Sequence, residues 1–178
     1  PVIQCMSTFH KNSPSALYYN GAIDVLTCDA IHAVDTLRWM GGGEVKAVAS
    51  DINAFNSERE NSFNAIVKFD SGASGYLCTN WAVGARIHIF EMHAHGISAY
   101  INPDLGETAV IHTSEGIQEL ATNEVAGSNE NYKAYGFYNE NRHFVDCLQK
   151  NLHPETNFTD AIKSMELVKK IYQNRIDP

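Results

Sequence analysis

Between residues 45 and 121, short segments that alternate apolar and polar residues follow one another with only brief turns between them. In the clearest pair, Ser62–Phe69 is apolar at every second position, and Asp70-Ser71-Gly72 leads into Ala73–Trp81. Alternation predicts half-buried strands, and Asp and Gly supply the backbone conformations of a tight antiparallel turn. Similar segments are Val45–Ile52, Arg86–Ala94, Ser98–Asn102, Thr108–His112 and Gln118–Ala121. The sequence therefore predicts a largely antiparallel sheet.

Helices flank this strand-rich middle. Asp24–Gly43 is predicted as one helix with Ala30, Ala33, Val34 and Leu37 on its apolar face, ended by the glycines at 41–43. A strand is expected at Val2–Phe9, a surface loop at Thr122–Lys133, and closing helices at about Tyr138–Gln149 and Asp160–Gln173, the last with Thr159 as N-cap. The predicted fold is α+β: residues 1–178 form a single domain with an open, mostly antiparallel sheet. Its helices pack on one face, and the other face is free for subunit pairing.

Composition narrows the functional classes. A chain of 178 residues with 44% hydrophobic and 19% charged residues can bury the core of one domain. The net charge of −8, with no cluster of Lys and Arg, argues against a nucleic-acid partner. No apolar run approaches the ~18–20 residues needed to cross a membrane. The four cysteines are widely spaced, which is typical of reduced thiols in a cytoplasmic protein. The start on a strand-like run without Met suggests a fragment or a processed chain.

His32 is the leading candidate for chemistry. On a continuous helix, Cys28, Asp29, Asp35, Thr36 and Trp39 lie within about 60° of His32, opposite the apolar face. A carboxylate that is hydrogen-bonded to one imidazole nitrogen fixes the tautomer and raises the basicity of the other nitrogen. Asp29 and Asp35 are each one turn away, so either can be that orienting partner. The alternative is a structural histidine whose ring is hydrogen-bonded to one of these aspartates and which has no part in catalysis.

Two other patterns compete with this one. Glu91, His93 and His95 alternate on one strand face, which suggests either a Zn or Fe site or a polar face covered by a partner or by solvent. Trp81 is expected at a strand end, either as the floor of a ligand pocket or as a buried anchor. The glycines at 41–43 follow a helix and precede a strand, the reverse of the dinucleotide-binding order, so no cofactor site is predicted in this chain.

Several segments together resemble one protein family. Asp29–Trp39 with the following glycines and Val45–Ser50, the hairpin Asn64–Leu77, its continuation Phe90–Ile101, and Gly136–Tyr172 are similar to the C-terminal domain of the glucose–fructose oxidoreductase / inositol dehydrogenase / MocA family. The resemblance implies an NAD(P)-dependent oxidoreductase that acts on a sugar, cyclitol or related polyol. It also implies an N-terminal Rossmann domain, absent here, that carries NAD or NADP and a catalytic lysine. The open sheet would then pair subunits into a homo-oligomer.

The resemblance also assigns roles. In many members a D-x-x-x-H pair contacts the reacting hydroxyl, and His32 falls on the acid/base histidine. The paired aspartate belongs at position 28, where this chain has Cys28 followed by Asp29. The expected catalytic residues are thus His32 and Asp29, and the expected substrate-binding residues are Cys28, Asp35 and Trp81. A non-catalytic carbohydrate-binding or protein-pairing module remains the alternative from another class, followed by a metal-dependent enzyme that uses Glu91, His93 and His95.

Overall fold

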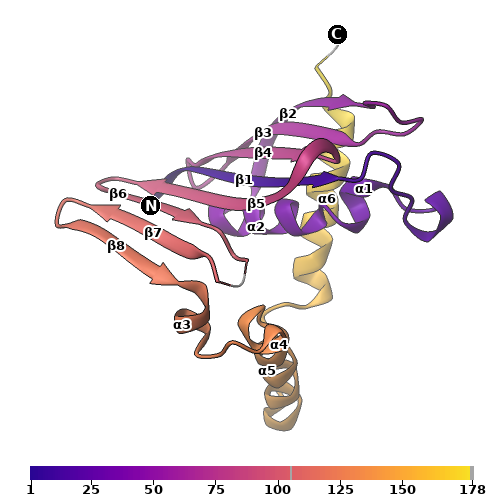
Figure 1. Cartoon of the computed structure of the whole chain (residues 1–178). Helices are drawn as coiled ribbons and strands as arrows, with labels where there is room; N and C mark the ends of the chain where they lie inside the picture. Colours follow the sequence, from indigo (N-terminus) through magenta and orange to yellow (C-terminus); the bar gives the residue numbers. More distant parts are fainter. Residues whose placement is uncertain (105, 177–178) are drawn as a thin grey trace.

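The computed structural model describes residues 1–104 and 106–176, and over these residues the chain forms one eight-stranded open sheet with six helices (Figure 1). The strands are β1 (Val2–Asn12), β2 (Val45–Asn53), β3 (Ser62–Phe69), β4 (Ser74–Asn80), β5 (Ala82–Ala94), β6 (Ile97–Ile101), β7 (Thr108–Thr113) and β8 (Gly116–Ala121). The helices are α1 (Val25–Cys28), α2 (Ile31–Gly41), α3 (Thr122–Ala126), α4 (Asn131–Ala134), α5 (Phe137–Lys150) and α6 (Phe158–Gln173). None of the described helices is both long and apolar enough to span a bilayer.

The sheet is mostly antiparallel, as predicted. Its strand order is β2-β3-β4-β1-β5-β6-β7-β8, and in the described chain only the β1–β4 pair is parallel. The hairpin of β3 and β4 has the predicted bounds within a residue, with Phe63 opposite Thr79 and Val67 opposite Gly75. The strand β1 is inserted between β4 and β5, so the first residues of the chain lie at the centre of the sheet.

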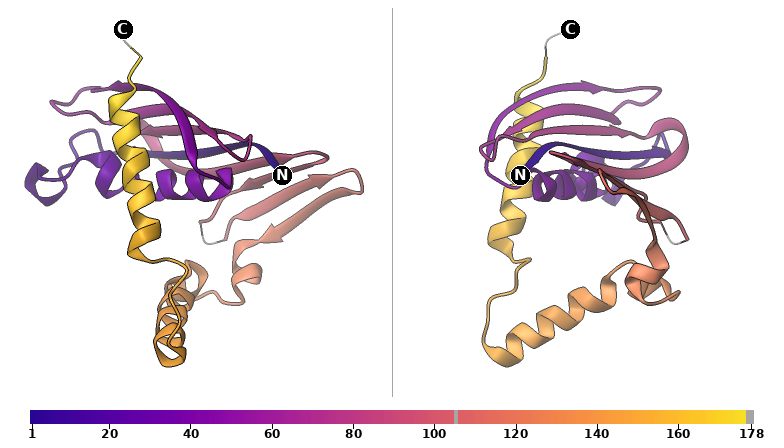
Figure 2. Two further views of the ribbon diagram at one scale, coloured as in Figure 1. Left: turned by 180° about the vertical axis from the view of Figure 1, so that it is seen from behind. Right: turned by 90° about the vertical axis from the view of Figure 1, so that its left-hand side faces the viewer.

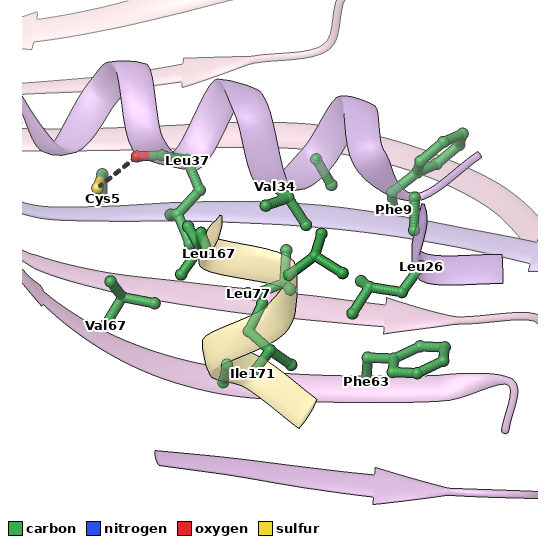
Figure 3. Close-up of a cluster of buried hydrophobic side chains, with 14 of the residues drawn as sticks. Cys5, Phe9, Leu26, Val34, Leu37, Phe63, Val67, Leu77, Leu167 and Ile171 are labelled. Atoms are coloured by element: carbon green, nitrogen blue, oxygen red, sulfur yellow. Dashed lines mark hydrogen bonds between the residues drawn. The ribbon is translucent and has the colours of Figure 1, made fainter. Parts of the chain in front are cut away.

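The core lies between one sheet face and the helices α2 and α6, which confirms the predicted α+β fold (Figure 2). Alternate residues of the central strands point into it, and α2 and α6 supply the facing side chains (Figure 3). The approach is close at Gly75, where a Cβ atom would lie 2.8 Å from the Phe69 ring and 3.2 Å from Leu37. The labelled core residues in Figure 3 are Cys5, Phe9, Leu26, Val34, Leu37, Phe63, Val67, Leu77, Leu167 and Ile171.

The segment predicted as one helix, Asp24–Gly43, is two helices. Asp24 caps α1 through a 2.8 Å bond from the Thr27 N–H, and α1 ends at Cys28. The Ala30 N–H then bonds the Val25 carbonyl five residues back, and the His32 N–H reaches the Asp29 carbonyl only three residues back. This irregular turn interrupts the regular helical hydrogen bonding. The positions of Cys28 and Asp29 relative to His32 therefore differ from those on a continuous helix.

Three smaller predictions were wrong. Thr122–Lys133 contains α3 and the start of α4, each about one turn long and too short to show an amphipathic period. The strand predicted at Arg86–Ala94 begins four residues earlier, because β5 starts at Ala82. The N-cap of α6 is Asn157 rather than Thr159, and its side chain accepts a 3.1 Å bond from the Asp160 N–H.

Candidate functional site

The turn between α1 and α2 places Asp29 against β1 and the segment that follows it. One carboxylate oxygen of Asp29, Oδ2, lies 2.5 Å from the Lys11 ammonium and 2.5 Å from the Tyr18 hydroxyl. The buried Trp81 indole donates a 3.1 Å hydrogen bond to the same hydroxyl. The Lys11 ammonium also lies 5.0 Å from the centre of the Phe9 ring. Asp29 is therefore held between two donors, one of which, Tyr18, packs against the core.

These contacts set the protonation states of Asp29 and Tyr18 at neutral pH. Burial raises the pKa of Asp29, but the hydrogen bonds from Lys11 and Tyr18 outweigh it and bring the pKa below its ordinary value. Burial, followed by the bond to Asp29, raises the pKa of Tyr18 to about 12. At neutral pH Asp29 is therefore a carboxylate and Tyr18 a protonated donor. A carboxylate so stabilised is a weak proton acceptor, which favours a part in holding charge and geometry over proton transfer.

His32 lies exposed in the first turn of α2, beside Asp29. It borders a cavity of about 610 Å³ whose wall also includes Lys11, Asp29, Asp35 and the aromatic ring of Phe90. In the described chain neither aspartate is hydrogen-bonded to His32, so the predicted orienting partner is not found. The structure does bring His32, Asp29 and Lys11 to one cavity wall, with the imidazole accessible to a bound molecule.

Asp35 mainly ties α2 to α6. Its Oδ1 accepts a hydrogen bond from the Ser164 hydroxyl and lies 3.3 Å from the Arg38 guanidinium. Arg38 in turn bonds Ser164 at 2.9 Å and Asp160 at 2.6 Å. This network joins the helix that carries His32 to the last helix of the chain. The contacts of Asp35 thus favour a structural role, although its side chain reaches the cavity wall.

Cys28 and Trp81 are not among the described residues that line this cavity. Burial, with the nearby charges of Asp29 and Asp24, raises the pKa of the Cys28 thiol, so it stays protonated. Asp29, unlike Cys28, lines the cavity, so of these two neighbouring positions it is the one whose side chain reaches the site. Trp81 is fully buried at 0% exposure and donates to the Tyr18 hydroxyl, which favours the buried anchor over the floor of a ligand pocket.

Lys11, Tyr18 and His88 were missed by the sequence analysis. The ring of His88 stacks on Phe9 with centroids 4.4 Å apart, and burial lowers its pKa to about 4. Within the described chain the buried Nε2 of His88 has no hydrogen-bond partner. The alternation of side chains along β1 could have identified Lys11. Phe9 and Lys11 are two residues apart, so their side chains point to the same face of the sheet, which is the core face.

Glu91 and His93 lie on the sheet face opposite the helices, and His95 lies exposed in the turn after β5. His93 is 2.9 Å from the Ser98 hydroxyl through Nδ1 and 3.6 Å from Glu91 through Nε2. Over residues 1–104 and 106–176, no three His, Cys, Asp or Glu side chains converge as a metal site would require. The described structure therefore gives the metal-dependent alternative no support.

The chain is therefore an α+β domain that has an open sheet with helices on one face and a cavity walled by His, Asp and Lys side chains. The chain belongs to the GFO/IDH/MocA C-terminal domain family, whose sequence profile matches residues 8–116. This match covers more than half of the chain and confirms the resemblance inferred from the sequence. No curated protein sequence matches the chain as a relative.

Solved structures share the fold at low sequence identity. The dehydrogenase MviM from Clostridium difficile superposes with a TM-score of 0.79 and 19% identity, covering 97% of this chain and 54% of its own. Levoglucosan dehydrogenase in complex with NADH superposes with a TM-score of 0.81 and 14% sequence identity, and the match covers 97% of this chain and 56% of the dehydrogenase. UDP-N-acetylglucosamine 3-dehydrogenase GnnA from Acidithiobacillus ferrooxidans superposes with a TM-score of 0.77 and 11% sequence identity, and the match covers 98% of this chain and 53% of GnnA. The chain thus spans about half the length of each of these proteins.

Proposed function

We propose that this chain is the substrate-binding half of an NAD(P)-dependent oxidoreductase that oxidises a hydroxyl group of a sugar, cyclitol or related polyol. The observation that carries the proposal is the accessible His32 beside the ionised Asp29–Lys11 pair, in one cavity of a domain from this family. The solved relatives include dehydrogenases of sugars, one of them with NADH bound. NAD or NADP, held by a separate nucleotide-binding half, would accept the hydride from the carbinol carbon.

This chain's own residues would manage the substrate and its proton. The imidazole of His32 takes the hydroxyl proton as the carbonyl forms and returns it in the reverse direction. The ammonium of Lys11, only 29% exposed, donates hydrogen bonds to substrate oxygens. Asp29 holds this ammonium in place and acts as a positioning residue instead of the predicted second acid/base. The Phe9 and Phe90 rings supply an apolar wall for the C–H face of a polyol.

Activity of the longer protein tests this proposal. The polypeptide that joins this chain to a nucleotide-binding half should reduce NAD⁺ or NADP⁺ with at least one member of a panel of sugars and cyclitols. In isothermal titration the isolated chain should show no micromolar binding of NADH or NADPH. A longer protein that binds the cofactor but oxidises none of the panel would contradict the proposed activity. Micromolar cofactor binding by the isolated chain would contradict the division into two halves.

We also propose that the sheet face opposite the helices pairs two copies of the chain. Large apolar side chains stand on this face, including Ile66 at 48% exposure and Tyr100 at 41%. Exposed apolar groups of this kind are typical of surfaces that another molecule covers. Sedimentation should find a dimer, and Ile66→Glu should shift it toward the monomer. A wild-type chain that stays monomeric at high concentration would contradict the pairing.

A further inference from the structure

The candidate cavity has a second wall that the proposed reaction does not use. The first wall consists mainly of side chains of β1, β5 and α2, among them Lys11 and His32. The second wall comes from the junction of α4 and α5, and we call its three residues, Tyr135, Phe137 and Glu140, the α4–α5 wall. Figure 1 shows α4 and α5 below the sheet layer. A molecule that fills the cavity therefore contacts both walls.

The backbone brings the three side chains of the α4–α5 wall together. Gly136, between the two aromatic residues, has a left-handed φ of 85° and is the N-cap of α5. Glycine adopts this conformation at little cost. Glu140 follows Phe137 by three residues on α5, so their side chains are neighbours on one helix face. Tyr135 and Phe137 are 46% and 58% exposed. Two aromatic rings and a carboxylate are thus accessible to a bound molecule.

The lining of the cavity carries more negative than positive charge. Its described carboxylates are Asp29, Asp35, Asp104 and Glu140, and its basic side chains are Lys11 and Arg86, which leaves a formal charge of −2 with His neutral. Both basic side chains already form ion pairs with carboxylates of this lining. Asp35 interacts with Arg38 and Ser164. In the described chain the Glu140 side chain has no hydrogen bond or ion pair, so its carboxylate is available to a ligand.

A carboxylate beside aromatic rings suits a bound ammonium group. Hydrogen bonds from an ammonium to a carboxylate are strengthened by the charges of both groups. The faces of aromatic rings also attract cations. An anionic substituent would be repelled by the excess negative charge, and a neutral hydroxyl would form the hydrogen bond without the attraction between charges. The α4–α5 wall is therefore matched best by a positively charged substituent.

We propose that the substrate of this cavity is an amino sugar or aminocyclitol whose ammonium group binds the α4–α5 wall. This inference rests on the proposed function and narrows its substrate class. The carbinol carbon next to His32 loses its hydride to NAD⁺ or NADP⁺, and the hydroxyl proton passes to His32. The amine lies on a different carbon, and its C–N bond stays intact. Glu140 thus holds the end of the substrate remote from the reacting carbon, while Lys11 binds hydroxyl groups near His32.

Titrations of the isolated chain followed by NMR test this inference without catalysis. The probes are D-glucosamine, D-galactosamine and scyllo-inosamine, each compared with the sugar or cyclitol that has a hydroxyl in place of the amine. At least one amine should shift the amide signals of residues 135–140 and bind with a Kd about 10-fold or more below that of its counterpart, as expected for a hydrogen bond between charged groups. The N-acetyl derivative of that amine, which is uncharged, should bind like the hydroxyl counterpart.

Glu140→Gln should remove the preference for the amine, because it keeps the shape of the side chain and removes its charge. The matched control is Glu124→Gln in α3, an exposed residue outside the cavity lining. It changes the net charge of the chain by the same amount and should keep the preference. This pair of variants separates binding at the α4–α5 wall from general attraction of cations to an acidic protein.

Equal Kd values for all amines and their hydroxyl counterparts would overturn the inference, even if the longer protein oxidises a neutral polyol. A preference that survives in Glu140→Gln, or that the N-acetyl derivative shares, would overturn it as well. A preference for the amine in a protein whose longer form oxidises none of the probes would support the ammonium site and contradict the proposed function.

Discussion

The Tyr18 hydroxyl joins the core of the domain to its candidate site, and Tyr18→Phe tests that link. The hydroxyl accepts the hydrogen bond of the Trp81 indole at 3.1 Å and donates to the Asp29 carboxylate at 2.5 Å. The substitution removes one oxygen and leaves the ring in place. Two hydrogen bonds are thus lost without a large cavity.

The expected cost follows from these two bonds. A buried N–H left without a partner costs about 1–3 kcal/mol, and a hydrogen bond to a charged group contributes about 1.5–3 kcal/mol. Asp29 keeps its bond to Lys11, and relaxation of the Trp81 indole recovers part of the loss. We therefore expect Tyr18→Phe to lower the free energy of unfolding by about 2–4 kcal/mol at pH 7, measured by urea denaturation with an unchanged m-value.

The neighbouring Tyr19, 73% exposed, supplies the matched control, and Tyr19→Phe should change stability by less than about 0.5 kcal/mol. The folded pKa of Asp29 lies below its ordinary 3.8, so its ionised form contributes stability above that pH. This contribution is lost as the pH falls through the folded pKa. Since Tyr18→Phe removes one cause of the lowered pKa, the variant should lose less stability than wild type on acidification. A Tyr18→Phe protein as stable as Tyr19→Phe would refute the reasoning.

Two further substitutions test the packing around the site. Gly75→Ala should cost about 1–3 kcal/mol, because its Cβ would lie 2.8 Å from the Phe69 ring, whereas Gly84→Ala, with open space around it, should cost far less. Equal melting temperatures for these two variants would contradict the close approach of α2. The pKa of His88 is lowered to about 4 in the folded protein, so the unfolded chain takes up the proton first as the pH falls below 6.5. Between pH 6.5 and pH 4 the free energy of unfolding of wild type should therefore fall by roughly 2–3 kcal/mol more than that of His88→Phe. The same pH dependence of stability in the two proteins would contradict a buried neutral imidazole.

Local patterns sufficed for most of the sheet. Ser62–Phe69 was predicted with its observed bounds, because its alternation and the Asp-Ser-Gly turn are both read within a few residues. The break between α1 and α2 was not predictable in this way. It depends on Asp29 turning toward Lys11 and Tyr18, which lie 18 and 11 residues away along the chain. Periodicity alone continues the helix through Ala30, which is buried in either arrangement.

The candidate site was only partly predictable, because it also depends on contacts between residues that are distant in the sequence. His32 stood out because it lies opposite an apolar helix face, and the structure leaves it exposed beside a cavity. Lys11 lies on β1, and the packing of α2 against this strand brings it to Asp29. Trp81 was assigned to substrate because an aromatic residue at a strand end fits a pocket as well as a core. The structure buries Trp81 completely, which favours a place in the core.

The role of His32 is tested most directly by single-turnover hydride transfer in the longer protein, with an oxidisable polyol and saturating NAD⁺ or NADP⁺. His32→Ala should slow the appearance of reduced nicotinamide by about 10²–10⁴-fold, the usual contribution of a general base, while the Kd of the cofactor stays unchanged. His95→Ala, in the exposed turn after β5, is the matched control and should react at the wild-type rate. Hydride transfer in His32→Ala at the wild-type rate would contradict the assignment of His32 as the acid/base.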